Sequence, residues 1–333
     1  MLIREMLEEE EDRSLHPQAA RSARTRGRAQ PEAPCAIRTA FQRDRDRILY
    51  AKAFRRLKHK TQVFISPEGD HYRTRLTHTL EVSQIARTVA RSLRLNEDLT
   101  EAISLGHDLG HTPFGHAGER VLDRICPLGF RHNEQSVRVI EVLEKDRQGL
   151  NLTWEVRDGI RCHTGPDRAA TLEGRIVRHA DRIAYINHDI EDAIRGGVIT
   201  EADIPAACVS VLGETSSRRI HTMITSLIAG SASLEDIRMA PEIQAASDRL
   251  RDFMFERVYV GSVAKQEENK AERLVAVIYD TLADRPELMP EDDRAAIASD
   301  GLHRVVCDYV AGMTDPFAVR FFKEMYLPES WNG

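Results

Sequence analysis

The sequence predicts an all-α protein on the strength of two observations. Apolar residues recur at helical spacing through most of the chain, and the alternating pattern of strands is nearly absent. Examples of the helical spacing are Ile48, Ala51, Phe54 and Leu57, followed by Leu80, Ile85, Val89 and Leu93. The one exception is residues 62–72, where Pro67, Glu68 and Gly69 favour a short hairpin or loop.

The 333 residues are enough for one large domain or two, and the pattern divides them into four segments. Residues 1–34 join an acidic run to a basic, proline-containing stretch with few apolar side chains, which predicts a mobile arm. Residues 35–200 form the predicted helical core, which carries every motif of interest. Residues 201–260 are expected to be a helical subdomain, and residues 261–333 are expected to be C-terminal helices that complete the fold.

Composition excludes several classes of protein. A formal net charge of −6 argues against a surface that coats nucleic acid, so any phosphate site must be local. The five cysteines contain no CxxC pair, which predicts reduced thiols and a cytoplasmic protein. No run approaches the roughly 20 apolar residues that cross a bilayer. The N-terminus also lacks the apolar stretch of a secretory signal, so no membrane partner is expected.

Residues 107–119 carry the densest chemistry in the chain. They read His-Asp-Leu-Gly-His-Thr-Pro-Phe-Gly-His-Ala-Gly-Glu. His107 and Asp108 are adjacent, His78 lies upstream and Asp181 downstream. Together they supply two imidazoles and two carboxylates, which suits one divalent cation.

The spacing places these four ligands on three predicted helices. His78 falls in a predicted helix over 73–94, His107 and Asp108 in the next, and Asp181 in another over 174–195. Helices that converge on one ion make a site in the core of a bundle. Four ligands leave positions open for water and a phosphate oxygen, so Mn, Mg, Fe, Co or Ni fits better than a closed structural zinc site. Such an ion polarises a phosphoryl oxygen and lowers the pKa of a bound water.

The remaining histidines are candidates for proton transfer. His111 lies four residues after His107, on the same face of the predicted helix, which Pro113 then ends. His116 and Glu119 begin another helix three residues apart, so the carboxylate can orient the imidazole. We therefore assign His116 as general acid or base and Glu119 as its partner. The plain alternative is an ordinary surface pair.

At this point the chain resembles a known family. The order His, His-Asp, Asp is typical of the HD phosphohydrolases, and residues 37–195 resemble the deoxynucleoside triphosphate triphosphohydrolases within that group. The motifs that carry the resemblance are FQRDRDRI (41–48), AFRRL (53–57), KTQVF (60–64), RLTH (75–78), the 107–119 block, HNEQS (132–136) and ADRIAYINHDIED (180–192). The fold implied is an all-α HD-domain helical bundle with a helical insertion and a C-terminal helical region.

The resemblance implies hydrolysis of a dNTP at the α-phosphorus to deoxynucleoside and inorganic triphosphate. By similarity, the metal ligands are His78, His107, Asp108 and Asp181. Arg75, His111 and Arg182 contact phosphate, His116 with Glu119 handles protons at the scissile bond, and His132 supports that pocket. Gln62 and Asp189 bond the sugar 3′-hydroxyl, and Tyr185 lies against C2′ so that a ribose hydroxyl clashes.

Spacing supports part of this assignment independently. Asp181, Tyr185 and Asp189 recur every four residues, so one helix face presents them in a row. Without the resemblance, Tyr185 reads as core, Arg182 as a solvated charge and Gln62 as a loop cap. Trp154, His163 and His188 lie near the motifs and are read either as structural residues or as residues that support the site from behind.

Members of the family are often homo-oligomers, and a nucleotide or single-stranded DNA can act as an effector at a second site, to which no residue is assigned here. The chain is shorter than the longest dGTP-specific members, which favours several dNTP substrates over dGTP alone. Two other functions remain open. One is a different HD phosphohydrolase, a nucleotide phosphatase or phosphodiesterase, and the other is a non-catalytic nucleotide-sensing or DNA-binding HD protein.

Overall fold

The computed structural model describes residues 2–62, 73–260 and 264–328. Within these ranges the protein is helical without a strand, and pairing of the β type is limited to isolated bridges between Arg28 and Thr153 and between Thr61 and Thr74. The all-α prediction is confirmed. The predicted hairpin or loop at 62–72 lies, apart from Gln62, outside the described residues.

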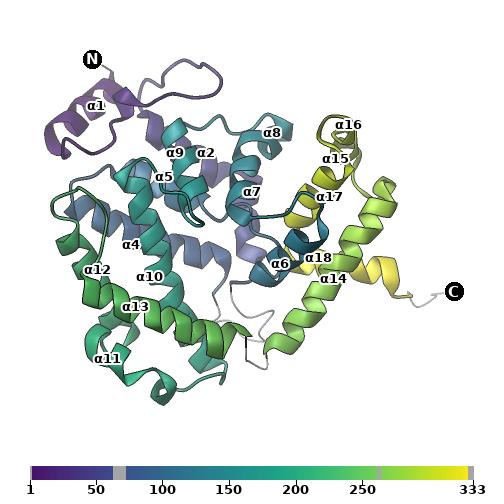
Figure 1. The fold of residues 1–333 in the computed structure, drawn as a ribbon. Coiled ribbons are helices and arrows are strands. Elements are labelled where there is room, and N and C mark those ends of the chain that lie inside the picture. The colour runs from purple at the N-terminus through teal and green to yellow at the C-terminus, as the bar shows by residue number, and fades with distance from the viewer. Residues whose placement is uncertain (1, 63–72, 261–263, 329–333) are drawn as a thin grey trace.

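Helices account for most of the chain up to residue 195 (Figure 1). They are α1 (Ile3–Ser14), α2 (Ala40–Tyr50), α3 (Lys52–Arg56), α4 (Arg75–Ser92), α5 (Glu97–Gly106), α6 (Gly115–Ile125), α7 (His132–Arg138), α8 (Glu144–Arg147), α9 (Trp154–Cys162) and α10 (Leu172–Arg195). The predicted helices over 73–94 and 174–195 correspond to α4 and α10.

The rest of the described chain, from residue 206 onward, is also helical. They are α11 (Ala206–Leu212), α12 (Ser216–Gly230), α13 (Pro241–Met254), the π-helical turn η5 (Phe255–Val260), α14 (Ala264–Asp284), α15 (Glu291–Ala295), α16 (Ile297–Asp300), α17 (Leu302–Ala311) and α18 (Asp315–Tyr326). Among the described residues, no helix has both the length and the apolar character needed to cross a bilayer.

Local sequence explains where the site-bearing helices begin. The side chain of Asn96 accepts a hydrogen bond from Leu99 N at 3.0 Å and caps α5. Thr171 caps α10 in the same way through Gly174 N at 3.1 Å. Such caps satisfy backbone N–H groups that lack a partner within the helix, and each contributes about 1 kcal/mol.

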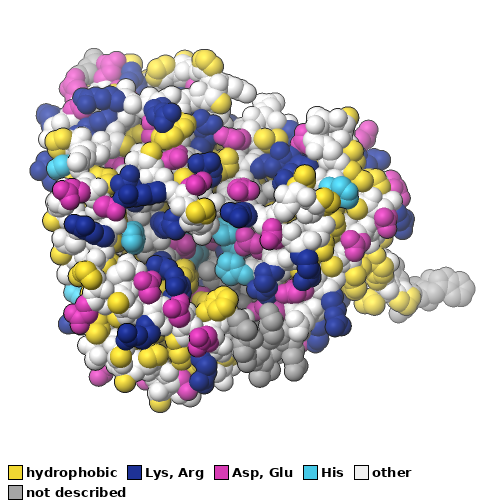
Figure 2. All heavy atoms as spheres, viewed as in Figure 1, with side chains coloured by type: hydrophobic (Ala, Val, Ile, Leu, Met, Phe, Trp, Pro, Cys, Tyr) yellow, Lys and Arg dark blue, Asp and Glu magenta, His cyan; other side chains and the backbone are white. Residues whose placement is uncertain are grey.

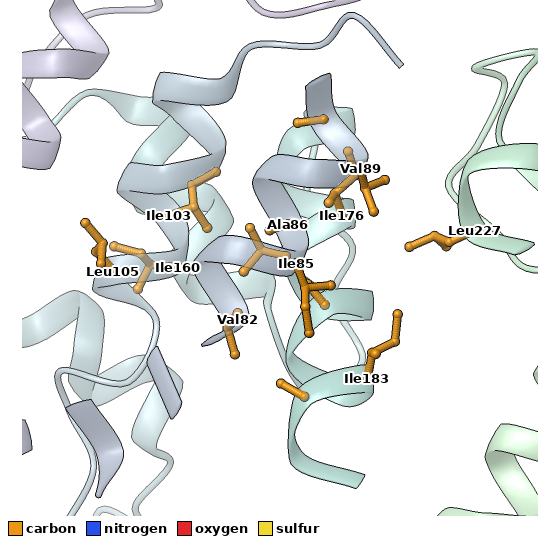
Figure 3. Packing of buried hydrophobic residues seen from close by; sticks show 14 of the residues in the cluster. Val82, Ile85, Ala86, Val89, Ile103, Leu105, Ile160, Ile176, Ile183 and Leu227 are labelled. Atoms are coloured by element: carbon orange, nitrogen blue, oxygen red, sulfur yellow. The ribbon is translucent and has the colours of Figure 1, made fainter. Parts of the chain in front are cut away.

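The described core consists of two apolar clusters. The larger one joins α2, α4, α5, α9 and α10 to α11–α13, and Figure 3 shows its centre, where side chains of α4 pack between α5 and α10. Ile85, Ile103 and Ile183 are almost fully buried there, and each such side chain contributes about 1.5–3 kcal/mol. The second cluster joins α6 to α14 and α17, on the right of Figure 1. Helix α6 therefore packs against the C-terminal helices, although the sequence assigns both α6 and α4 to one core segment.

Two glycines let α5 and α9 approach closely next to the site. A Cβ atom on Gly106 would lie 2.5 Å from Ile160 Cδ1, and one on Gly159 would lie 2.4 Å from Ile103 Cδ1. Cβ atoms do not make such contacts, so a larger residue at either position would force the facing isoleucine side chain to move. The crossing brings His107, at the end of α5, beside His163, at the end of α9, with ring centroids 5.0 Å apart.

The N-terminal segment lies against the core through polar contacts. Helix α1 has no buried residue, in keeping with the few apolar side chains noted in the sequence. Even so, Glu11 accepts hydrogen bonds from Ser22 N at 2.7 Å and from Asn96 Nδ2 at 3.1 Å. Arg28 forms an ion pair with the fully buried Asp44. The mobility of this arm and the four segment boundaries stay predictions.

Candidate active site

The chemistry-bearing residues line one cavity of about 660 Å³. It opens between α4, α6, α10 and the chain from Arg251 to Tyr259, and Figure 2 shows histidine side chains in a hollow near the centre of the face. Predicted site residues on its wall are Gln62, Arg75, His78, Asp108, His111, His116, Glu119, His132, Asp181, Tyr185 and Asp189. A cavity of this size can hold a nucleotide.

The four predicted metal ligands lie close together, and three of them, His78, Asp108 and Asp181, line this cavity. His78 Nε2 lies 3.1 Å from Asp181 Oδ1, and His107 Nε2 lies 3.8 Å from the same oxygen and 3.5 Å from Asp108 Oδ1. His78, His107 and Asp108 are buried, and the Asp181 side chain is 20% exposed. The structure thus brings together donors from α4, the turn after α5, and α10.

The backbone prepares His107 to bind a cation. His107 Nδ1 lies 2.6 Å from Ser104 O, and because a carbonyl only accepts, Nδ1 carries the proton. His107 Nε2 then presents a lone pair, and it has no hydrogen-bond partner among the described residues. A buried acceptor without a donor is costly, and a metal ion would satisfy it. The four predicted metal ligands therefore fit a divalent cation.

Both carboxylates at this position are ionised. Burial acts to raise the pKa of Asp108, but the positive charges around it, that of the Arg75 guanidinium among them, hold it well below its usual range. Arg75 Nη1 donates to Asp108 Oδ2 at 2.7 Å. Burial likewise opposes ionisation of Asp181, whereas the hydrogen bond from His78 lowers its pKa to about 2. Two negative charges are thus held ready for a cation.

One detail of the helix prediction is wrong. Helix α5 ends at Gly106, and residues 107–110 form a turn, so His111 does not continue a helical face from His107. The cause lies in Ser136, whose hydroxyl donates to His107 O at 2.7 Å and accepts from Gly110 N at 2.9 Å. These bonds replace the helical ones.

Of the three residues predicted to contact phosphate, Arg75 and His111 line the cavity and Arg182 does not. Arg75 is buried, and its Nε and Nη2 have no hydrogen-bond partner among the described residues, so two donors remain for an anion at the cavity wall. His111 also lines the cavity. Arg182 does not line the cavity, and it pairs with Asp248 of α13 at 3.1 Å instead.

Glu119 binds two histidines, and the contact with His132 is the closer one. Its carboxylate lies 2.8 and 3.0 Å from His132 Nδ1 but 3.4 Å from His116 Nδ1. His132 N also donates to it at 2.9 Å. Burial opposes ionisation of Glu119, yet these hydrogen bonds hold its pKa far below the usual range. The His116 side chain is 67% exposed, which leaves it free to reach a ligand in the cavity.

His163, read from the sequence as a structural or a supporting residue, extends this hydrogen-bonded chain. Its Nδ1 lies 2.7 Å from Ile160 O and must donate, so its Nε2 accepts from His132 Nε2 at 3.1 Å. His132 then donates from both ring nitrogens and is positively charged. The pKa directions agree, because burial lowers the pKa of His163 to about 3 whereas Glu119 outweighs burial at His132 and raises its pKa.

The predicted sugar-binding residues also line the cavity. Tyr185 and Asp189 follow Asp181 along α10, and Gln62 also lines the cavity. The hydroxyl of Tyr259 donates to Asp189 Oδ2, while Asp189 Oδ1 has no partner among the described residues. Burial raises the pKa of Asp189 to about 7, and the Tyr259 hydrogen bond opposes that shift.

Sequence reasoning missed the segment from 251 to 259. It contributes Arg251, Phe255 and Tyr259 to the cavity wall, the last two on the π-helical turn η5. The available signal was two arginines and three aromatic residues within nine positions of a chain with only 6% aromatics. π-helical turns often mark functional positions, but i→i+5 pairing leaves no pattern in a single sequence.

The comparisons with known proteins agree with this fold and site. Residues 75–186 match the model of the HD domain, and residues 237–324 match that of the phosphohydrolase-associated domain. A solved phosphohydrolase from Bacteroides thetaiotaomicron has a similar fold, with a TM-score of 0.50 and 17% identity over 85% of this chain and 69% of that one. The chain therefore contains an HD domain and its associated domain, and it shares its fold with that phosphohydrolase.

Two curated relatives narrow the family. One, from Caldanaerobacter subterraneus subsp. tengcongensis, is 56% identical over 99% of this chain and 98% of its own length. Another, from Desulfatibacillum aliphaticivorans, is 48% identical over 98% of this chain and 99% of its own. Both are named deoxyguanosinetriphosphate triphosphohydrolase-like protein, and the chain belongs to that family.

Proposed function

We propose that the protein is a metal-dependent dNTP triphosphohydrolase that converts dNTPs, dGTP among them, to deoxynucleoside and inorganic triphosphate. One observation carries the proposal. His78, Asp108 and Asp181 line the same cavity as the unpartnered Arg75 donors and the Glu119–histidine group, and His107 lies directly behind Asp108 and Asp181. A cytoplasmic location and a homo-oligomer are part of this proposal, and an effector site for a nucleotide or single-stranded DNA stays a prediction.

The four ligands would hold one divalent ion, Mn, Mg, Fe, Co or Ni. Such an ion supplies Lewis-acid activation of the phosphoryl group and of an attacking water. The free Nε2 of His107 and the two ionised carboxylates are the features of this chain that support it.

The other residues bind the triphosphate and move protons. Arg75 and His111 line the wall beside the ligand cluster, where they can contact phosphate oxygens. Hydrolysis breaks the bond between the α-phosphorus and the 5′-oxygen, and that oxygen needs a proton, which we assign to His116 with Glu119 as its partner. His132, charged through Glu119 and His163, supports this pocket. Arg182 can contact phosphate only if its ion pair with Asp248 opens.

The sugar would lie along α10. Asp189 and Gln62 have unpartnered oxygens that can accept the 3′-hydroxyl, and Tyr185 stands between Asp181 and Asp189. A tyrosine against C2′ excludes a ribose hydroxyl by its bulk. Tyr185→Ala should therefore raise turnover of rNTPs relative to dNTPs, and an unchanged ratio would remove this assignment.

Product analysis tests the function directly. Purified protein is incubated with each dNTP and rNTP in Mg²⁺ or Mn²⁺, and products are separated by anion-exchange chromatography. Deoxynucleoside with tripolyphosphate is the expected pair. Diphosphate or monophosphate products would instead indicate a different HD phosphohydrolase, and tight nucleotide binding without any product would indicate a sensing protein.

A further inference from the structure

The turn from His107 to Phe114 carries three predicted site residues but has few bonds of its own to hold His111. Within the turn, His111 N donates to Asp108 O at 3.1 Å, and Thr112 Oγ1 donates to Gly115 O at 2.8 Å. Phe114, which precedes α6, has a left-handed backbone with φ of 60°, a conformation that persists only when its surroundings enforce it. The enforcing contacts come from residues distant in sequence.

Lys60 is one of them. Its side chain is buried, and Nζ donates both to His111 O and, at 2.9 Å, to Ala311 O at the end of α17. Burial lowers the pKa of Lys60 to about 7. Burying an amine costs folding free energy. The contact of Lys60 with the carbonyls of His111 and Ala311 is therefore kept at the expense of stability.

Asp315 is the second contact. It is the first residue of α18 and is 5% exposed. One carboxylate oxygen accepts from Phe114 N at 3.0 Å, and the other accepts from Thr61 N at 2.9 Å and from the Thr61 hydroxyl. Both oxygens are used, and a carboxylate at a helix N-terminus is further favoured by the helix dipole.

We propose that Asp315 and Lys60 are positioning residues for the reaction, which fix the backbone of His111 and the start of α6 by tying them to the C-terminal helices. The inference rests on the proposed function and adds that residues 311–315, which do not line the cavity, set the geometry inside it. Through Phe114 the same contact determines where α6 begins, and α6 carries His116 and Glu119.

Kinetics of matched variants test this proposal. Asp315→Asn replaces one acceptor oxygen by a donor that faces N–H groups, so it should lower kcat by roughly 10- to 100-fold through misplacement of the site, with a much smaller change in KM. Thr61→Val removes the hydroxyl that donates to Asp315 without changing the shape of the side chain, and it should lower kcat. Thr61→Ser keeps this hydroxyl and should keep the kcat of the wild type. The control is Asp300→Asn, because Asp300 also ties the C-terminal helices to the core, through Arg138 and Arg147, but away from the cavity.

Asp300→Asn is expected to lose stability yet keep kcat. If Asp315→Asn and Asp300→Asn lose kcat equally, the proposal is overturned. It is also overturned if the loss of kcat in Asp315→Asn is no larger than the loss in the fraction of folded protein. Ring signals of His111 and His116, recorded by NMR on the full Mg²⁺-treated protein, should shift in Asp315→Asn and not in Asp300→Asn. If the wild-type protein cleaves no dNTP, the proposed function fails, and these signals alone decide whether Asp315 positions the turn.

Discussion

Glu119 shows how a single buried carboxylate organises the acid and base groups. It is ionised although largely buried, because His132 and His116 both donate to it. Glu119→Gln should lower kcat by about 10²- to 10⁴-fold, the usual contribution of a positioned proton-transfer group. Metal content should stay the same, because Glu119 is not one of the four ligands. Glu134→Gln, an exposed carboxyl on α7, is the matched control. Loss of metal in Glu119→Gln would mean that this account of its role is wrong.

Asp189 allows a pH prediction with a definite sign. Its folded pKa of about 7 lies above its unfolded value near 3.8. Below pH 3.8 both states bind the proton, and between 3.8 and 7 only the folded state does. Stability is therefore lost as pH rises through this window, with a slope of at most about 1.4 kcal/mol per pH unit.

Asp189→Asn removes that penalty. Its gain in Tm over the wild type should be small at pH 4, increase up to pH 7 and then stay level, as measured by thermal unfolding across that range. A gain in Asp189→Asn that is equal at pH 4 and pH 8 would contradict the assigned pKa.

The sequence was informative about single residues where chemistry and spacing coincide. His78, His107, Asp108 and Asp181 could be predicted because few other patterns combine two imidazoles and two carboxylates on converging helices. For His163 the sequence left a structural and a supporting role open, because the choice depends on its facing His132 across 31 residues. Tyr259 was missed for a similar reason, since its contact with Asp189 spans 70 residues.

Between elements, charged side chains do much of the joining. Arg28 connects the N-terminal segment to α2 through Asp44, which also accepts from Thr153 N at 2.8 Å before α9. Arg28→Ala would leave Asp44 buried and without its cation, which typically destabilises a protein by about 3–5 kcal/mol. Urea unfolding should show a midpoint lowered accordingly. Arg24→Ala, which breaks an exposed pair with Asp12, should change the free energy of unfolding by less than about 1 kcal/mol.

Helical periodicity predicted α4 and α10 within two residues at either end but extended α5 too far. Apolar spacing reports the face of a helix that packs, and it remains strong through α4 and α10 because both are central to the larger cluster. The end of α5 is decided by Ser136, which lies on α7 and bonds the turn from outside. A helix end determined by a distant hydroxyl is not encoded in local sequence.

At the scale of the whole molecule, the site is a junction between two cores. The metal ligands belong to elements of the larger cluster, whereas α6, with His116 and Glu119, packs into the second one. Composition and periodicity could predict that both halves are helical, but not that α6 would pack against α14 and α17, because that depends on which apolar faces meet. The cavity exists only when the two cores are joined.

This arrangement makes the metal a cross-link between segments distant in sequence, so its removal should be measurable in the whole fold. An ion at 1,000 times its Kd stabilises the state that binds it by about 4 kcal/mol, and Tm should rise by several degrees when Mn²⁺ is added to chelator-treated protein. Asp181→Ala should abolish both the activity and this rise, because it removes the ligand from α10. Glu191→Gln, on the same helix and paired with Arg73, should keep both. A rise in Tm that persists in Asp181→Ala would place the ion elsewhere, and activity that survives exhaustive chelation would refute a metal-dependent reaction.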